Sequence, residues 1–359
     1  MRISRRVFLG TCAAACAAPM VARAAGVEDL AAGFLKDWNA PGLSVAFLMR
    51  GKLRLAQGFG HADPARQEAL TPDHRFRIAS LSKPLTAAAV LALAAEGRLD
   101  PDHRVFAEGG LLRGFLPPAP PRPDWLEAVT VDHLLSHRAG GWGNDWRDPM
   151  FIDPAVPQAE LIRRTLAGEP LQAEPGAGFA YSNFGYCLLG RVIEAVTGRG
   201  YDAFLQQNLF APAGAAGFAL GGSRLQDRLP REVIYGGAED PYGMNLPRMD
   251  SHGGWIATPQ DMVTVFARMD GDKTLRDVVA PEVPRRMAKP GEPGGGYGRG
   301  LTLNPAHGNR WHTGSLPGVT TIAVMIEGGG VFAGFTSSRA EGIDFALEGL
   351  MWQMHDRLI

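Results

Sequence analysis

Cysteine and lysine are both scarce in this chain of 359 residues. It has three cysteines, and only five of its 36 basic residues are lysines. So few cysteines exclude a framework of several disulfides, and the scarcity of lysine makes a lysine-containing motif less frequent by chance. The apolar stretch Val7–Ala18 is shorter than the roughly 20 residues that a membrane-spanning helix needs. We therefore expect no stable insertion into a membrane.

The N-terminus is typical of an export signal. Ser4–Leu9 matches a twin-arginine signal, and Ala22-Arg23-Ala24 places small residues where a signal peptidase cuts. Residues 1–24 are therefore predicted to be a signal peptide, cleaved after Ala24, that sends the protein to the periplasm or outside the cell. Lipid anchoring at Cys16 is the less favoured alternative, because alanine stands three residues earlier where a larger apolar residue is usual.

The chain that remains after cleavage is mildly acidic. Residues 1–24 carry four arginines and no acid, so their removal moves the formal net charge from −1 to −5. Such a protein has no electrostatic reason to bind nucleic acid or anionic lipid. Cys187 is then the single remaining cysteine, which excludes an internal disulfide, and its apolar neighbours favour a buried structural thiol.

Two β-hairpins are predicted, one near each end of the chain. A short turn separates Leu43–Met49 from Leu53–Gln57, and three glycines separate Thr320–Ile326 from Val331–Thr336. Glu341–Leu358 has helical spacing. We therefore expect an α/β (α+β) fold, in which an antiparallel sheet built from both termini is flanked by helices and a mostly helical lobe is inserted.

The chain is longer than the roughly 250–300 residues at which a single core stops growing, which favours two lobes. We assign residues 25–80 and 251–359 to the α/β lobe and residues 81–250 to the helical lobe. Within the helical lobe, Ser80 to Glu96 is apolar nearly all round, a pattern typical of a buried helix. Gly97 marks its predicted end.

The first candidate for chemistry is Ser80-Leu81-Ser82-Lys83, an S-x-x-K motif at the start of that helix. Residues three apart share one face of a helix, so the Lys83 amine is expected to reach the Ser80 hydroxyl. Burial lowers the pKa of an amine, and a neutral amine accepts the serine proton. The helix N-terminus adds a favourable field for an oxyanion. The alternative is an ordinary helix start, with Ser80 as a cap and Lys83 as a surface charge.

The second candidate, Tyr181-Ser182-Asn183, follows a turn signal at residues 174–176. A tyrosine beside an ammonium group is expected to ionise below its usual pKa of about 10 and to shuttle a proton. The Asn183 amide both donates and accepts hydrogen bonds, so we expect it to hold Lys83 and a substrate amide together. The alternative is a loop tyrosine packed on the core.

The third candidate, His312-Thr313-Gly314-Ser315, directly precedes the second hairpin. Gly314 has no side chain, so a substrate is expected to approach the backbone closely there. The N–H of Ser315 is expected to act with the N–H of Ser80 as an oxyanion hole. His312 and Thr313 are candidates for binding a substrate carboxylate. The alternative is the polar start of a strand.

In this order, the three motifs resemble the class C β-lactamase and D,D-peptidase family of penicillin-recognising serine hydrolases. Three further segments share the resemblance. Phe76–Ala79 is similar to the approach to the family's nucleophile, Leu134–Gly140 resembles its LLxHxSG segment with Ala139 where serine is usual, and Gly253–Asp261 resembles its GG-x-x-S/T-x-x-D segment. The resemblance covers roughly residues 27 to 350 and implies a β-lactamase/transpeptidase-like fold.

The resemblance also implies a mechanism through a covalent acyl-enzyme. Ser80 is the nucleophile, Lys83 and Tyr181 share the proton transfers, and Asn183 positions Lys83 and the substrate. The backbone N–H groups of Ser80 and Ser315 form the oxyanion hole. Family members use neither a metal nor another cofactor, so none is expected here.

One departure from the family pattern bears on the substrate. β-Lactamases of this class carry lysine at the position of His312, whereas His-Thr-Gly resembles some exocellular D,D-peptidases, and His-x-Gly some esterases and aminopeptidases. An imidazole is neutral for part of the time near pH 7, so it anchors a carboxylate less well than lysine. We therefore favour a carboxylesterase or D,D-peptidase-like hydrolase of a small ester, amide or peptide over a β-lactamase.

Three other classes of protein fit the sequence less well. His133 and His137 have the i, i+4 spacing of zinc ligands, but the acidic residue of H-E-x-x-H is missing because Leu134 follows His133. An α/β-hydrolase needs Gly-x-Ser-x-Gly, which no serine here satisfies. A non-catalytic sensor of penicillin or peptidoglycan remains the alternative from another class, although the complete set of proton-transfer residues favours an enzyme.

Overall fold

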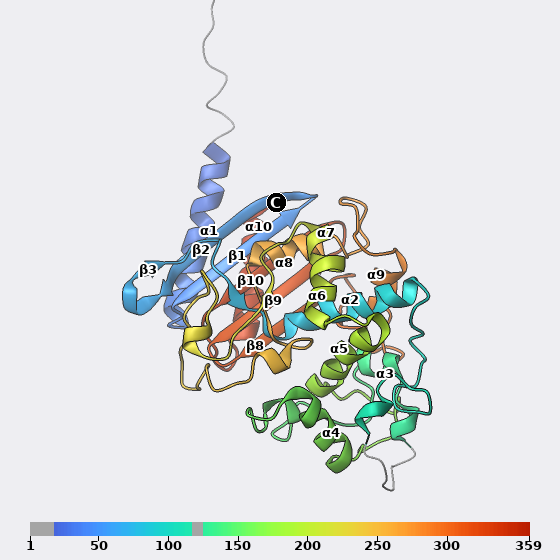
Figure 1. The fold of residues 1–359 in the computed structure, drawn as a ribbon. Helices are drawn as coiled ribbons and strands as arrows, with labels where there is room; N and C mark the ends of the chain where they lie inside the picture. Colours follow the sequence, from blue (N-terminus) through green and yellow to red (C-terminus); the bar gives the residue numbers. More distant parts are fainter. Residues whose placement is uncertain (1–17, 117–124) are drawn as a thin grey trace, which may run out of the picture.

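A seven-stranded antiparallel sheet unites the two ends of the chain. The computed structural model describes residues 18–116 and 125–359, with side chains from residue 26, so the twin-arginine segment and Cys16 lie outside it. The strand order is β3-β2-β1-β10-β9-β8-β7. The strands are β1 (Gly42–Met49), β2 (Lys52–Asp63), β3 (Glu68–Ala69), β7 (Thr302–Leu303), β8 (Arg310–Leu316), β9 (Val319–Ile326) and β10 (Gly330–Thr336). Early and late strands meet where β1 pairs with β10, as predicted (Figure 1).

Both predicted hairpins are present, and their turns explain the residues found there. Arg50 and Gly51 link β1 to β2 with φ angles of 50° and 70°, and Gly328 and Gly329 link β9 to β10 with φ angles of 90° and 94°. Glycine adopts such positive φ angles without steric penalty. Each strand begins one residue before its predicted start, and β2 extends beyond the predicted end to Asp63.

Helices α1 (Ala18–Asp37) and α10 (Ile343–Leu358) pack together on one face of this sheet (Figure 1). Leu347 of α10 is fully buried against Phe47 of β1 and Phe332 of β10 in one apolar cluster. The predicted C-terminal helix is therefore confirmed. Across residues 18–116 and 125–359, no helix is both long enough and apolar enough to cross a bilayer.

The opposite face of the sheet carries the larger core. Successive strand residues point to opposite faces, and Ala46, the neighbour of Phe47, belongs to this second cluster. A small three-stranded sheet lies beside it in the order β4-β6-β5. The other elements are β4 (Phe76–Arg77), α2 (Ser82–Ala95), α3 (Val131–Leu135), α4 (Gln158–Gly168), α5 (Asn183–Thr197), α6 (Tyr201–Leu205), α7 (Ala211–Ala213), β5 (Ala219–Leu220), β6 (Trp255–Ala257), α8 (Pro259–Phe266) and α9 (Glu282–Met287).

Helix α2 is buried as expected, but its start differs from the prediction. The α-helix begins at Ser82, and Ser80 lies before it in a tight 3-10 turn, Ala79–Leu81. Ala79 has a φ angle of 49°, an uncommon conformation for a residue with a side chain. The helix ends at Ala95, and Gly97 follows with a φ angle of 71°, as predicted. Ser80, the nucleophile candidate, therefore lies in a turn whose conformation must be stabilised by contacts with neighbouring segments.

Replacing Leu347 by alanine tests the packing of α10 on the sheet. The buried side chain leaves a cavity, so the free energy of unfolding is expected to fall by about 2–5 kcal/mol. Phe345→Ala on the same helix is the matched control, because Phe345 is 77% exposed and its loss is expected to change stability by less than about 0.5 kcal/mol. Urea unfolding of both variants provides the measurement, and equal losses would contradict the described packing.

Candidate active site

The turn that carries Ser80 is pressed against strand β8 at Gly314. A Cβ atom on Gly314 would lie 2.4 Å from the carbonyl oxygen of Ile78 and 2.4 Å from Oγ1 of Thr321. Thr321 Oγ1 donates a hydrogen bond of 3.0 Å to that same carbonyl. The missing side chain of Gly314 makes room for the turn that holds Ser80. The close approach of a substrate to Gly314 stays a prediction.

The amine of Lys83 is fully buried and has three oxygen neighbours. Its Nζ atom lies 3.0 Å from Ser80 Oγ, 2.6 Å from Asn183 Oδ1 and 3.0 Å from the carbonyl oxygen of His252. Amide and carbonyl oxygens only accept hydrogen bonds. A neutral amine therefore donates its two hydrogens to these oxygens, which leaves its lone pair facing the Ser80 hydroxyl.

Burial also sets the charge of this amine. The ammonium form loses its hydration inside the protein, which lowers the pKa of Lys83 to about 7, while the negative charge of Asp148 acts in the opposite direction. Near neutral pH, a large share of Lys83 is therefore in the form that accepts a proton. The direction of the pKa shift expected from the S-x-x-K motif is confirmed.

The side-chain amide of Asn183 is oriented by an acid that the sequence analysis did not single out. Nδ2 of Asn183 donates to Asp148 Oδ2 at 2.7 Å and to Asn144 Oδ1 at 3.0 Å. A carboxylate oxygen only accepts, so these contacts fix which end of the amide faces Lys83. Both Nδ2 hydrogens are engaged by protein groups. The predicted contact of Asn183 with Lys83 is confirmed, and its contact with a substrate amide stays a prediction.

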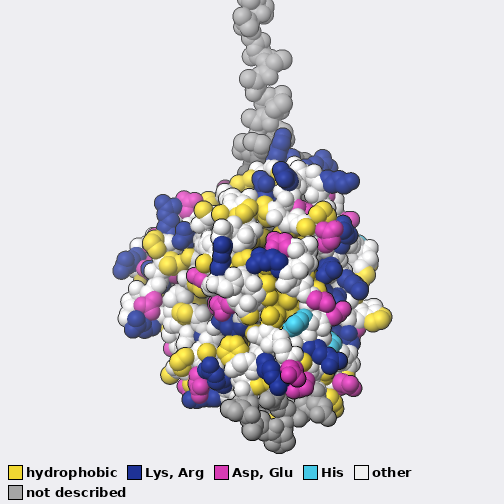
Figure 2. All heavy atoms as spheres, turned by 45° about the vertical axis from the view of Figure 1, so that its right-hand side comes forward, with side chains coloured by type: hydrophobic (Ala, Val, Ile, Leu, Met, Phe, Trp, Pro, Cys, Tyr) yellow, Lys and Arg dark blue, Asp and Glu magenta, His cyan; other side chains and the backbone are white. Residues whose placement is uncertain are grey.

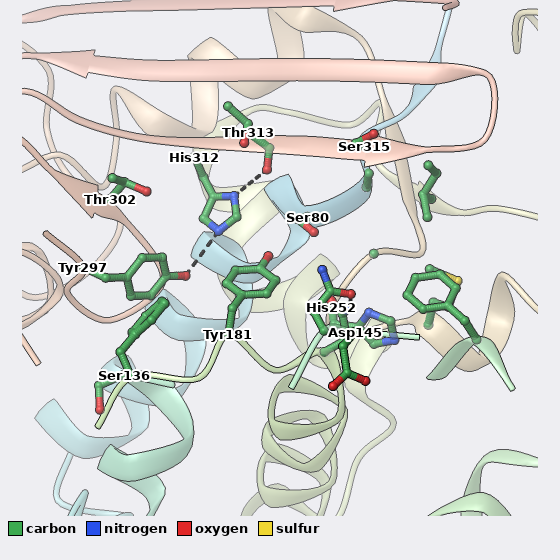
Figure 3. Close-up of a pocket in the computed structure, with 18 of the residues that line it drawn as sticks. Ser80, Ser136, Asp145, Tyr181, His252, Tyr297, Thr302, His312, Thr313 and Ser315 are labelled. Atoms are coloured by element: carbon green, nitrogen blue, oxygen red, sulfur yellow. Dashed lines mark hydrogen bonds between the residues drawn. The ribbon is translucent and has the colours of Figure 1, made fainter. Parts of the chain in front are cut away.

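Tyr181 lies beside Ser80 (Figure 3). Its ring centroid is 4.8 Å from Lys83 Nζ and 4.3 Å from the ring centroid of His137. Burial raises the pKa of Tyr181 above its ordinary value, and the hydrogen bond with Ser80 lowers it by less. The expectation that Tyr181 ionises easily is therefore wrong. It is a neutral phenol near pH 7, able to donate a hydrogen bond.

His312 projects from β8 into the same site. Burial lowers its pKa to about 3, and the nearby charge of Lys83 adds to this effect. Its imidazole is therefore neutral throughout the physiological range. A neutral ring lacks the positive charge of the lysine that the family's β-lactamases carry at this position, which weakens the expected role of His312 as a carboxylate anchor.

A cavity of about 900 Å³ opens over these groups. The predicted site residues that line it are Ser80, Tyr181, Asn183, His312, Thr313 and Ser315. Apolar side chains contribute too, among them Trp146 and Phe179, whereas Trp142 is buried in the core against Phe184. On the face drawn in Figure 2, apolar side chains gather near the centre and charges of both signs are interspersed around them.

The zinc alternative conflicts with the contacts of its two candidate ligands. His133 Nδ1 accepts a hydrogen bond from the N–H of Thr130 at the start of α3, and His137 Nδ1 accepts one from the N–H of Ser182. In the described part of the chain, no three His, Cys, Asp or Glu side chains are grouped to hold a metal ion. Both histidines therefore stabilise the fold, and His137 also packs against neighbouring tyrosine rings.

A serine and a buried lysine beneath a cavity, in this arrangement of sheet and helices, define the class of β-lactamase-fold serine hydrolases. The comparison with protein families agrees. The model of the family described as "Beta-lactamase" matches residues 27–353. The chain belongs to this β-lactamase family.

Two bacterial proteins show similarity over part of their length. Penicillin-binding protein 4* of Bacillus subtilis (strain 168) is 30% identical over 236 residues, which make up 64% of this chain and 48% of that protein. Protein flp of Staphylococcus aureus (strain COL) is 28% identical over 178 residues, which make up 50% of this chain and 34% of flp. The chain thus spans about a third to a half of the length of these relatives.

Solved structures match over nearly the whole chain. The D-amino acid amidase from Ochrobactrum anthropi SV3, complexed with L-phenylalanine amide, has a TM-score of 0.72 and 26% identity, covering 93% of this chain and 97% of the amidase. EstCE1, a hydrolase with promiscuous acyltransferase activity, has a TM-score of 0.71 and covers 95% of this chain and 98% of its own. Its identity is 19%, so this likeness shows the fold alone.

Four residues of the site were not singled out from the sequence. Asp148 and Asn144 orient Asn183, His252 supplies a carbonyl oxygen to Lys83, and Tyr297 contacts His312. Tyr297 follows three glycines, which carry no signal for a site residue. His252 directly precedes the predicted GG segment, and that adjacency was the one signal available for it.

Replacing Gly314 by alanine tests the close contact between β8 and the turn. The new Cβ displaces the carbonyl of Ile78 and with it Ser80. A displacement on the order of 1 Å is expected to slow labelling of Ser80 by a fluorophosphonate about 100-fold. Gly178→Ala is the control, because no atom lies within 4 Å of the added Cβ. Unchanged labelling of a folded Gly314→Ala variant would show that the contact does not position Ser80.

Proposed function

We propose that this protein is an exported hydrolase that cleaves an ester or amide through an acyl-enzyme on Ser80. The observation that carries the proposal is the contact of 3.0 Å between Lys83 Nζ and Ser80 Oγ, together with the pKa of Lys83 near 7. A serine hydroxyl is a weak nucleophile until a neighbouring base removes its proton. The neutral Lys83 amine is placed to be that base.

Acylation follows from this geometry. Lys83 Nζ takes the proton of Ser80 Oγ while that oxygen attacks the substrate carbonyl carbon. The N–H groups of Ser80 and Ser315 stabilise the oxyanion of the tetrahedral intermediate. The proton then passes from the Lys83 ammonium, through the hydroxyl of Tyr181, to the leaving oxygen or nitrogen. The bond from the carbonyl carbon to the leaving group breaks, and the acyl group stays on Ser80 as an ester.

Hydrolysis of the acyl-enzyme reverses these proton transfers. A water molecule attacks the ester carbon and gives its proton to the pair of Lys83 and Tyr181. The Ser80 oxygen leaves and recovers a proton, so the enzyme returns to its starting state. Asn183 keeps the Lys83 nitrogen beside Ser80 throughout, because Asp148 and Asn144 fix its amide.

The proposed substrate class rests on the cavity and on similar proteins. The cavity is partly apolar and large enough for a small acyl compound. A D-amino acid amidase is among the similar structures, at 26% identity, which supports an ester or amide. D,D-peptidase-like activity belongs to the same proposal. Export by the twin-arginine route stays a prediction from residues 1–24.

The Ser80→Ala variant tests the covalent step. We expect the wild type to gain the mass of an acetyl group during reaction with p-nitrophenyl acetate, and the variant to gain none at this site. Lys83→Ala should slow acylation by about 10²–10⁴-fold, because the nucleophile loses its base. Intact-mass spectra over time measure both effects, with Ser338→Ala as a control outside the cavity lining. Acylation of Ser80→Ala at the wild-type rate would refute the mechanism.

Benzylpenicillin in the same mass assay separates the related activities. A stable adduct on Ser80 would favour a D,D-peptidase-like enzyme or a sensor. Hydrolysed penicillin without a lasting adduct would favour a β-lactamase. Within the proposed function, a carboxylesterase or amidase predicts neither a lasting adduct nor rapid hydrolysis of penicillin, alongside turnover of the simple ester.

The pH dependence of the reaction tests the role of Lys83. The neutral amine is the reactive form, and its fraction falls tenfold for each pH unit below the pKa. Since the pKa of Lys83 is lowered to about 7, kcat/KM is expected to rise with pH, to be half-maximal near pH 7 and to level off above it. The ester's own hydrolysis is measured with Ser80→Ala and subtracted. A profile that is flat from about pH 5 to 9 would contradict a lysine base.

A further inference from the structure

A row of three aromatic side chains lies at the wall of the cavity, and two of them, Tyr297 and His312, line it. Tyr297 stands in the loop between α9 and β7, with its hydroxyl oxygen 3.2 Å from His137 Nε2 on one side and 3.2 Å from His312 Nε2 on the other. His137 follows α3, and His312 belongs to β8. Figure 3 shows Tyr297 aimed at His312 and the second contact of His312 with Thr313. Three distant parts of the chain thus meet in one line.

The two ends of this row fix the direction of its hydrogen bonds. At one end, the backbone N–H of Ser182 donates to His137 Nδ1 at 3.0 Å, so Nδ1 carries no hydrogen. At the other end, His312 Nδ1 lies 2.5 Å from the carbonyl oxygen of Thr313. A carbonyl only accepts, so this nitrogen must carry the hydrogen. Burial lowers the pKa of both imidazoles, which keeps each ring neutral.

The direction of the middle contacts then follows from the chemistry of a neutral imidazole, which has one N–H and one lone pair. His137 must donate from Nε2 to the Tyr297 oxygen. His312 presents a lone pair at Nε2, to which the Tyr297 hydroxyl donates. The hydroxyl of Tyr186 is also close to Tyr297, but it donates to the carbonyl of Leu135, and its oxygen is a weaker base than an imidazole nitrogen.

We propose that Tyr297 and His137 are positioning residues that lock His312 as a neutral ring with its hydrogen on Nδ1. This inference rests on the proposed function and narrows its substrate. In the locked form, both nitrogens of His312 are occupied by protein groups. His312 therefore offers neither a charge nor a free N–H to the cavity, and the enzyme selects substrates that are uncharged beside β8.

The surroundings of the row support a fixed geometry. Arg299, two residues after Tyr297, forms a two-pronged ion pair with Asp132 of α3, with distances of 2.9 and 2.6 Å. This pair ties the loop of Tyr297 to the helix that precedes His137. The positive form of Lys83 lowers the pKa of both His137 and His312, because it opposes a second positive charge nearby.

The two arginines that line the cavity each have an acceptor within the protein. Arg339 binds Glu239 at 2.5 Å, and Arg138 donates to the carbonyl oxygen of Gly291 at 2.7 Å. The cavity is also lined by Asp145 and Glu292. A substrate carboxylate would therefore meet acids as well as arginines that already have acceptors, which agrees with selection for uncharged groups.

The hydrogen positions on His312 are tested directly, without substrate. Nitrogen-15 NMR of histidine-labelled protein distinguishes the two ring nitrogens, and His312→Gln identifies the His312 signal among nine histidines. We expect hydrogen on Nδ1 and none on Nε2 from about pH 5 to 8. In Tyr297→Phe, Thr313 still holds the hydrogen on Nδ1, and the Nε2 signal is expected to shift because its lone pair loses the hydrogen bond from the Tyr297 hydroxyl. A charged ring, or hydrogen on Nε2, in the wild type would overturn the proposal.

Selectivity is measured with three related esters. Phenyl acetate is compared with 3-carboxyphenyl acetate and with phenyl succinate, which carry a carboxylate on the leaving group and on the acyl group, respectively. The wild type is expected to prefer phenyl acetate. His312→Lys should raise relative kcat/KM for a carboxylate ester about 10-fold or more, because a charge-assisted hydrogen bond becomes available. Tyr297→Phe should raise the same relative kcat/KM roughly 2- to 10-fold.

Tyr201→Phe is the matched control, because its buried hydroxyl also bonds two groups, Thr86 and Trp255, outside the row. It should lower stability and leave the preference unchanged. The inference would be overturned if Tyr201→Phe changed the substrate preference as much as Tyr297→Phe does. It would also be overturned if neither His312→Lys nor Tyr297→Phe changed that preference. Failure of the proposed function is distinguishable, since then none of the three esters would acylate Ser80, while the NMR result would still stand.

Discussion

The burial of one amine governs this site. Lys83 is fully enclosed, and an enclosed ammonium group loses so much hydration that its pKa falls toward neutrality. The nearest carboxylate, Asp148, contacts Asn183 and not the amine itself, so it moderates the shift without cancelling it. The two acceptor oxygens around Nζ then decide which way the lone pair points. Burial and hydrogen-bond direction together suit Lys83 to the proposed role of base for Ser80.

The fold serves this arrangement by bringing distant segments to one place. The sheet joins strands from both ends of the chain, and β8 stands against the turn of Ser80 only because Gly314 has no side chain. Helix α2 carries Lys83 into the core, and the start of α5 presents Asn183 to it. The same neutral, buried character extends to Tyr181 and His312, so the reacting groups share a site in which charge is costly.

Much of this arrangement was predictable from the sequence. The hairpins, the buried helix and the spacing of Ser80 and Lys83 follow from local patterns that a few neighbouring residues determine. The start of α2 was misplaced, because the left-handed conformation of Ala79 depends on β8 and has no local signal. The pKa of Tyr181 was predicted in the wrong direction, because proximity to lysine was visible in the motif and burial was not. Asp148 and Tyr297 are joined to the site only by tertiary contacts.

The central claim is that Lys83 is neutral at working pH, and its titration can be observed directly. With five lysines in the chain, carbon-13 labelling at lysine Cε gives few NMR signals, and Lys83→Arg identifies the one that belongs to Lys83. The account predicts that this signal titrates near pH 7. A Lys83 signal that titrates near the ordinary lysine value of about 10.4 would contradict the account, because the nucleophile would then have no base.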